Sequence, residues 1–255
     1  MFEVIILLIA GIGAGIVTGL AGASAVMFAA PLLIVFLGYP AYLAIGISLS
    51  IDFFASLIST FVYGKSKRIK IKPSLILLIS SLIAVLIGSY FSKNIPSDDL
   101  GLATGIGIIL AGTSIILKRQ NKLTKKHIPF LEKYKTLVLI LVGLLIGTIA
   151  GVFGAGGGIM ILFTLIIILN YKTHEAIGTS VFLMIFIALF GGISHYYYLP
   201  FSIISLLIGA GGGIVGALFA SRLANKTNET KLKKSVGITI IFLGFLLILK
   251  NLFIS

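Results

Sequence analysis

The chain lacks cysteine altogether, which excludes disulfides, thiolate metal sites and cysteine nucleophiles. Charged residues are also scarce, at 11% of the 255 residues, whereas hydrophobic residues reach 58%. The mean hydropathy is correspondingly high, at +1.19. A soluble domain could not bury so much apolar surface, so the composition predicts an integral membrane protein.

Enzyme motifs are missing too. The sequence contains no H-E-x-x-H, no G-x-S-x-G, no phosphate-binding P-loop and no paired carboxylates. Its glycines interrupt apolar helical patterns and follow no strand, which disfavours a dinucleotide site. We therefore predict that the protein is not an enzyme and uses no cofactor, with an intramembrane enzyme as the least favoured alternative. With no nucleotide-binding domain in the sequence, energy would come from a gradient or from a separate partner.

What the sequence does contain is ten apolar segments. They are Val4–Leu20, Ala25–Leu37, Leu43–Tyr63, Ser74–Phe91, Leu100–Leu117, Leu137–Phe153, Ile159–Leu169, Ala176–Leu199, Phe201–Leu223 and Val236–Leu249. Barrel strands alternate polar and apolar residues and these segments do not, so all are predicted to be helices. The first follows Glu3 without a basic flank, which indicates a mature membrane segment and not a cleaved signal peptide.

Two of the ten segments, the second and the seventh, are short. The seventh, extended back to Gly156, would measure about 21 Å as a helix, while the hydrocarbon core is roughly 30 Å thick. It is expected to be either one half of a re-entrant hairpin or a tilted span.

The net charge of +13 could suggest a nucleic-acid partner, but the positions of the charges argue against one. All 20 Lys and Arg residues fall between apolar segments or near the chain ends. Basic loops at 65–72, 118–135 and 222–234 are predicted to be cytoplasmic by the positive-inside rule. The loops between them carry little positive charge, so both chain ends are expected outside.

The basic stretch 118–135 divides the chain into two halves, 1–117 and 136–255, which we interpret as repeats. Sliding residues 11–64 onto 143–196 at a constant offset of 132 gives 15 identities in 54 positions. Equivalent loops carry opposite charge patterns in the two halves, which predicts that the second repeat is inverted. The expected fold is an all-α membrane protein of two inverted five-segment repeats in one transmembrane domain.

The repeats are expected to contain broken or re-entrant helices at the first and second segments and at the sixth and seventh. Seven of the sixteen residues from Gly143 to Gly158 are glycine, which an ordinary helix would not tolerate. Inverted repeats with discontinuous helices are typical of secondary transporters, whose substrate site lies near the membrane midplane where the breaks meet.

The second break also shows a specific resemblance. Gly147-Thr-Ile-Ala-Gly-Val-Phe-Gly-Ala-Gly-Gly-Gly158, followed by Ala176-Ile-Gly-Thr-Ser180, resembles the paired motif of the TauE/SafE family of sulfite and organosulfonate exporters. The resemblance covers nearly the whole chain. It implies export of small sulfur-containing or carboxylate anions through the cytoplasmic membrane, coupled to an ion gradient. One departure is that Ser24-Ala-Val26 stands where the first-repeat motif usually carries further glycines.

Glycines of the second break are the first candidates for contact with the anion. A helix that begins inside the membrane presents unpaired N–H groups and the positive end of its dipole. The candidate glycines are Gly154, Gly156, Gly157 and Gly158. Other glycines are assigned to helix packing, because small residues at regular spacing are a common contact device. These are Gly143, Gly147, Gly151 and the triplet 211–213.

Four hydroxyl residues complete the predicted substrate-binding set: Ser24, Ser48, Thr179 and Ser180. Their hydroxyls could donate hydrogen bonds to oxyanion oxygens. The alternative is a bond back to a carbonyl of the same helix, which is common for Ser and Thr in membranes. Ser48 and Ser180 occupy equivalent positions of the two repeats, which favours a shared role.

Asp52 is the only acid deep within an apolar segment. A carboxylate at the membrane centre costs at least about 2.5 kcal/mol and is by default a functional hypothesis. We predict that Asp52 takes up or releases a coupling proton, or helps to hold a cation. The alternative is a protonated Asp52 bonded to Ser48, Ser50 or Ser56. No metal site is predicted.

These features favour a secondary exporter of small anions, with an anion channel of the same architecture as the alternative. The expected partners are a small anionic substrate and the lipid bilayer of the cell membrane, without nucleic acid, and a homo-oligomer is left open. His195, near the outer end of the eighth segment, is interpreted as a structural residue at the membrane interface.

Overall fold

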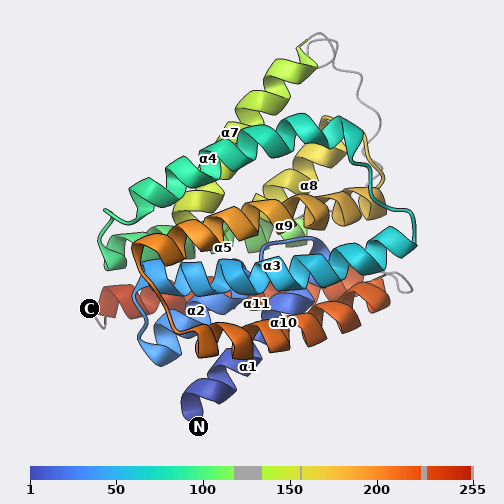
Figure 1. Ribbon diagram of the computed structural model, residues 1–255. Coiled ribbons are helices and arrows are strands. Elements are labelled where there is room, and N and C mark those ends of the chain that lie inside the picture. The colour runs from blue at the N-terminus through green and yellow to red at the C-terminus, as the bar shows by residue number, and fades with distance from the viewer. Residues whose placement is uncertain (118–133, 156, 225–228, 254–255) are drawn as a thin grey trace.

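The computed structural model describes residues 1–117, 134–155, 157–224 and 229–253, and within these ranges it contains helices and no strand (Figure 1). The α-helices are α1 (Phe2–Ala21), α2 (Val26–Leu37), α3 (Ala41–Lys65), α4 (Leu75–Ser92), α5 (Ser97–Leu117), α7 (Lys135–Phe153), α8 (Gly157–Ile167), α9 (Thr173–Tyr198), α10 (Ile203–Ala224) and α11 (Glu229–Phe253). A 3-10 turn, η1 (Lys72–Ser74), precedes α4. Each predicted apolar segment is thus confirmed as a helix. The predicted linker 118–135 lies outside the described residues except for its last two.

Seven described helical stretches are long and apolar enough to cross a membrane. The helices α2 and α8 have 12 and 11 residues, so they measure about 18 and 17 Å at ~1.5 Å per residue. Each of the two is preceded by a short non-helical segment that separates it from the helix before it. The predicted broken helices are therefore present at both corresponding positions.

Four helix pairs build the domain, and each pair joins the two halves of the chain. The helix α1 packs along α10, α4 along α7, α3 along α9 and α5 along α11. Figure 1 shows α3 and α9 side by side through the middle, with α4 on one side and α10 on the other. The pairing is unchanged when the halves are exchanged, as the predicted repeat requires. Their opposite orientation in the membrane stays a prediction.

Glycines let the first helix of each half lie directly against the fourth helix of the other half. A Cβ at Gly143, Gly147 or Gly151 would come within 3.0 Å of backbone atoms of α4. A Cβ at Gly11 or Gly15 would come within 3.0 Å of the backbone of α10. These approaches confirm the packing role predicted for the three glycines of α7.

The glycine triplet of α10 allows a stability prediction with a neighbouring control. A Cβ at Gly212 would lie 2.8 Å from the Leu8 carbonyl oxygen, whereas one at Gly211 would meet nothing within 4 Å. We expect Gly212→Ala to lower the free energy of unfolding by about 1–3 kcal/mol through overpacking. Gly211→Ala is expected to raise it by up to ~1 kcal/mol through helix propensity. Thermal unfolding of the two purified variants in detergent tests this, and equal effects would contradict it.

Candidate functional site

Two glycines with a positive φ end the helices that precede the breaks. Gly22 follows α1 with φ 63° and donates its N–H to the Thr18 carbonyl over 3.0 Å. Gly154 follows α7 with φ 65° and donates to the Ala150 carbonyl over 2.9 Å. Glycine adopts this conformation without the steric cost of a Cβ. The two glycines are equivalent at the offset of 132, so both breaks are built by one device.

The first break, residues 22–25 between α1 and α2, lies against the second break, which begins at Gly154 after α7. We call the place where they meet the junction. The Ser24 hydroxyl oxygen lies 3.1 Å from the Gly154 carbonyl oxygen, which joins the first break to the second. A Cβ at Gly158 would lie 2.8 Å from both the Gly22 carbonyl oxygen and the Ser24 nitrogen. Close contact with the first break is therefore sufficient to require glycine at position 158, whether or not an anion also binds there. Gly157 and Gly158 are buried, and Gly156 lies outside the described residues.

Asp52 lies at this junction, with no exposed surface. Its carboxylate accepts hydrogen bonds from the hydroxyls of Ser24 at 2.8 Å, Thr18 at 3.2 Å and Ser56 at 3.2 Å. Within the described residues the carboxylate has no ion-pair partner. Three hydroxyls from α1, the first break and α3 thus surround an acid that has no counter-charge.

Sequence reasoning identified part of this cluster. Ser56 was an expected partner because it follows Asp52 by one helical turn. Ser50 bonds instead to the Gly46 carbonyl of its own helix. Thr18 was missed, and only its position one turn before the break-forming Gly22 could have indicated it. Contacts between segments that are 34 residues apart are not visible in sequence spacing.

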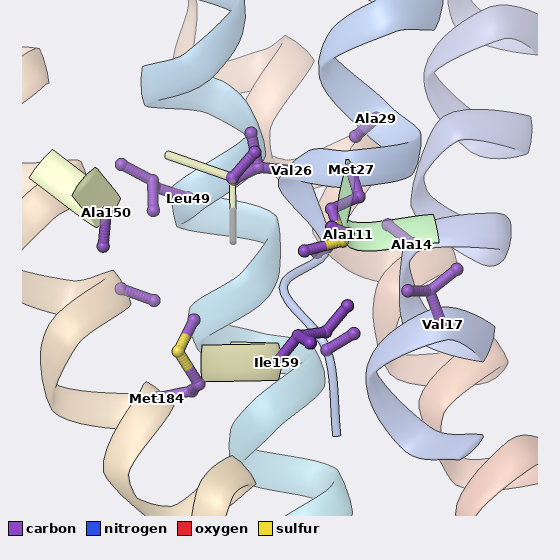
Figure 2. Packing of buried hydrophobic residues seen from close by; sticks show 14 of the residues in the cluster. Ala14, Val17, Val26, Met27, Ala29, Leu49, Ala111, Ala150, Ile159 and Met184 are labelled. Atoms are coloured by element: carbon purple, nitrogen blue, oxygen red, sulfur yellow. The ribbon is translucent and has the colours of Figure 1, made fainter. Parts of the chain in front are cut away.

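The cluster has no polar counterpart in the second half. The positions equivalent to Thr18, Asp52 and Ser56 are Ala150, Met184 and Ala188. A Cβ at Gly157 would lie 3.0 Å from the Ala150 Cβ and 3.8 Å from the Met184 sulfur. Figure 2 shows Ala150, Met184 and Ile159 from the second half in one view with Val26 and Leu49 from the first. The junction therefore has one polar wall and one apolar wall.

The two adjacent hydroxyls of α9 point to different surroundings. The Ser180 hydroxyl lies 2.9 Å from the Ile177 carbonyl oxygen of its own helix and 3.3 Å from the Gly22 carbonyl oxygen of the first break. The Thr179 hydroxyl accepts the Lys70 backbone N–H over 3.0 Å. Ser180 is thus at the junction, while Thr179 contacts the basic loop before η1.

That loop is held against the start of α9 by further contacts. The Lys70 ammonium lies 3.0 Å from the Glu175 carboxylate, and the Lys70 carbonyl accepts the Tyr171 hydroxyl over 3.3 Å. These contacts give the Thr179 hydroxyl a structural role that accounts for its burial.

Ser48 differs from the other predicted hydroxyls because its oxygen is buried and has no hydrogen-bond partner among the described residues. Buried polar groups are nearly always bonded, so an unpartnered one points to a ligand or an ordered water. Ser48 precedes Asp52 by one helical turn on α3, so the two side chains lie on the same side of that helix.

The chain matches both a protein-family model and individual membrane transporter proteins. The family model described as sulfite exporter TauE/SafE matches residues 7–247 of the chain. The chain is 29% identical over 273 residues to the probable membrane transporter protein YunE of Bacillus subtilis (strain 168), covering 98% of each. It is 27% identical over 237 residues to the probable membrane transporter protein YdhB of the same organism, covering 92% of this chain and 96% of that one. No solved structure matches the chain.

Proposed function

The chain belongs to the TauE/SafE sulfite exporter family of multi-pass membrane transporters, and on this premise we propose that it exports small anions across the cytoplasmic membrane. The substrate class is sulfite, sulfonates or related sulfur-containing or carboxylate anions, moved by secondary transport coupled to a proton or ion gradient. The observation that carries the proposal is the buried, unpaired Asp52 at the junction of two broken helices.

Anion binding is assigned to the junction beside Asp52. The N-terminal end of α8 begins at Gly157 inside the domain, where its amides and dipole favour negative charge. The unpartnered Ser48 hydroxyl is the side-chain donor that we assign to the substrate, and the Ser180 hydroxyl would join it only by giving up its bonds to the Ile177 and Gly22 carbonyls. Thr179 is left out of this set because its hydroxyl lies against the basic loop, where it accepts the Lys70 amide N–H, and not at the junction.

The charge of Asp52 explains why anion movement would be coupled to a second ion. Two like charges roughly 8 Å apart repel by about 2 kcal/mol at an effective dielectric constant of about 20. An anion at the junction therefore binds more tightly when Asp52 is protonated or neutralised by a cation. One proton or cation is expected to accompany each anion.

Ser24 provides a physical link between that protonation and the second break. Its hydroxyl has one hydrogen, and both the Asp52 carboxylate at 2.8 Å and the Gly154 carbonyl oxygen at 3.1 Å are acceptors for it. When Asp52 is ionised, Ser24 donates to the carboxylate. When Asp52 is protonated, its O–H can donate to Ser24, which is then free to donate to Gly154. The proton on Asp52 would thus strengthen the contact between the two breaks.

The assignment of Ser48 gives a prediction with a neighbouring control. Ser48→Ala is not expected to lower the free energy of unfolding, because the hydroxyl that it removes is buried and has no partner among the described residues. It is expected to raise the half-saturation concentration for the anion about 3- to 10-fold through loss of one hydrogen bond. Ser50→Ala is the control, since Ser50 bonds to its own helix. Transport assays in proteoliposomes measure this concentration for both variants. If Ser48→Ala leaves it unchanged, Ser48 does not belong to the substrate site.

The function as a whole is tested by an uptake screen. Purified protein in proteoliposomes is offered labelled sulfite, methanesulfonate, thiosulfate and acetate, with and without a proton gradient. We expect saturable flux of at least one anion that responds to the gradient. Flux without saturation or counterflow would indicate the channel alternative, and no flux under any gradient would refute the proposal.

A further inference from the structure

A stacked pair of aromatic side chains lies at the end of the α3–α9 pair where the loops are predicted to be outside. The rings of Tyr42, near the start of α3, and His195, near the end of α9, have centroids 4.3 Å apart and planes inclined by 22°. Tyr42 is 7% exposed and His195 is 1% exposed. His195 is thus buried against α3, which approaches α9 closely there, and its depth in the membrane stays a prediction. A Cβ at Gly46 would lie only 2.9 Å from the His195 Cβ.

Both rings carry a buried polar atom that lacks a hydrogen-bond partner among the described residues, Tyr42 Oη and His195 Nε2. The other ring nitrogen, Nδ1, lies 2.9 Å from the Gly191 carbonyl oxygen. A carbonyl only accepts, so Nδ1 carries the hydrogen, and Nε2 of the neutral ring is an acceptor. Leaving each of these buried atoms unpaired would cost about 1–3 kcal/mol, which favours contact of both with a ligand or an ordered water.

The two unpartnered atoms, Tyr42 Oη and His195 Nε2, indicate the chemistry of a suitable ligand. Tyr42 Oη can donate to an oxygen, while His195 Nε2 accepts from an O–H group. A small oxyanion that retains one proton, such as hydrogen sulfite, offers both groups at once.

A cation lies at the ring of Tyr198, one helical turn beyond His195. Tyr198 follows His195 by three residues and so lies on the same side of α9. The exposed Lys93 ammonium lies 4.2 Å from the centroid of the Tyr198 ring and 4.2 Å from that of Tyr90. Lys93 is also the only basic residue of the loops predicted to be outside. It would attract anions to the vicinity of Tyr42 and His195.

The repeat places a tyrosine of α3 opposite a histidine of α9 at both ends of these two helices. At the offset of 132, Tyr42 corresponds to His174 and Tyr63 corresponds to His195. Asp52 is ten residues from Tyr42 and eleven from Tyr63, which is about 15 Å from either along the helix. Tyr42 and Tyr63 therefore flank Asp52 on α3, one toward each end of the helix. The Tyr63 hydroxyl donates to the Gly19 carbonyl over 2.8 Å, so the outer pair is the one with its tyrosine hydroxyl unpartnered in the described part of the chain.

We propose that Tyr42 and His195 form an outer subsite that binds a small oxyanion retaining one O–H group, on its way between the Asp52 junction and the outside. The Tyr42 hydroxyl donates to an oxygen of the anion, and the anion donates its hydrogen to His195 Nε2. The subsite rests on the proposed anion transport, because it lies at one end of the same helix pair.

The test compares the two faces of the protein with sulfite as the probe. In oriented proteoliposomes, Tyr42→Phe is expected to raise the half-saturation concentration for sulfite at the outer face about 10-fold, and to leave that at the cytoplasmic face unchanged. Without anion, its thermal unfolding temperature is not expected to fall, because the hydroxyl that it removes lacks a partner in the described structure. Tyr90→Phe is the control, as Tyr90 is 47% exposed and keeps its ring beneath Lys93.

Two further arms separate the outcomes. His195→Phe keeps an aromatic ring on Tyr42 but lacks both nitrogens, and it is expected to reproduce the outer-face shift. Methanesulfonate, which has no O–H group, is expected to compete with sulfite at the outer face at least ten-fold more weakly than unlabelled sulfite. The subsite alone would be overturned if the half-saturation concentration for sulfite at the outer face were unchanged in both variants, or shifted equally at the two faces. Competition by methanesulfonate as strong as that by unlabelled sulfite would also overturn it. Absence of wild-type flux with every anion would overturn the proposed function as well.

Discussion

The Asp52→Asn variant is expected to carry anions down their gradient at a rate that no longer responds to a gradient of protons or cations. Asparagine keeps the size, its amide oxygen can accept from Thr18 and Ser56, and its NH2 group can donate to Ser24, which then donates to the Gly154 carbonyl, so the fold is expected to persist. It cannot exchange a proton or change its charge, and the anion no longer meets a like charge at the junction. The loss of coupling is expected to be complete.

Flux into proteoliposomes with and without an imposed pH gradient, and separately a sodium gradient, measures this loss. Asp99→Asn is the matched control, because Asp99 is an exposed acid at the start of α5. Ser24→Ala tests the link to the second break and is expected to weaken coupling while leaving the acid in place. If Asp52→Asn transports with an unaltered gradient dependence, Asp52 is not the coupling group.

The Gly154→Ala variant is expected to lose transport and several kcal/mol of stability. An alanine in the left-handed helical conformation costs about 1–2 kcal/mol, and at the φ of 65° and ψ of −30° of Gly154 the cost is expected to be at least as large. The added Cβ would also lie 2.7 Å from the Ile45 side chain and 3.0 Å from that of Val26, which adds about 1–3 kcal/mol of overpacking. Because both neighbours belong to the junction, relieving the contact would displace the first break relative to the second.

Gly38→Ala separates the two costs. Gly38 ends α2 with φ 65° and ψ 21°, whereas Gly154 has the same φ with ψ −30°, and a Cβ at Gly38 would meet nothing within 4 Å. The control is therefore expected to lose only the 1–2 kcal/mol of the backbone term and to retain transport. Denaturant unfolding in detergent, together with flux of the anion found in the screen, compares the two variants. Equal losses would show that packing at the junction contributes nothing.

Much of the fold was predictable because its signals are local. Apolar runs long enough for the membrane specify helices, since a lipid-facing backbone has no other way to satisfy its hydrogen bonds. Glycines at equivalent positions of two matching segments located both breaks, and Gly22 and Gly154 do adopt the conformation that only glycine favours. Asp52 was identifiable because a carboxyl group at membrane depth is costly enough to need a reason.

Predictions about particular side chains depended on contacts between distant segments and were less complete. Neighbouring hydroxyls at 179 and 180 looked alike in sequence, yet one binds the Lys70 amide and the other lies against Gly22. His195 was expected to be a structural residue near the outer end of its segment, and the structure places its buried ring against Tyr42. In each case the direction of a side chain on its helix, together with the neighbouring helix, decides its surroundings.

The sequence by itself determined the class of protein, the helices, the two breaks and the one acid in their midst, because hydropathy, glycine conformation and the cost of a buried charge act on each residue locally. Only the tertiary structure decided that the breaks touch, that Thr18, Ser24 and Ser56 converge on Asp52, and that the second half presents alanine and methionine in their place. Those features depend on how closely helices approach, and the glycines of α1 and α7 allow that approach only once their partner helices are in position.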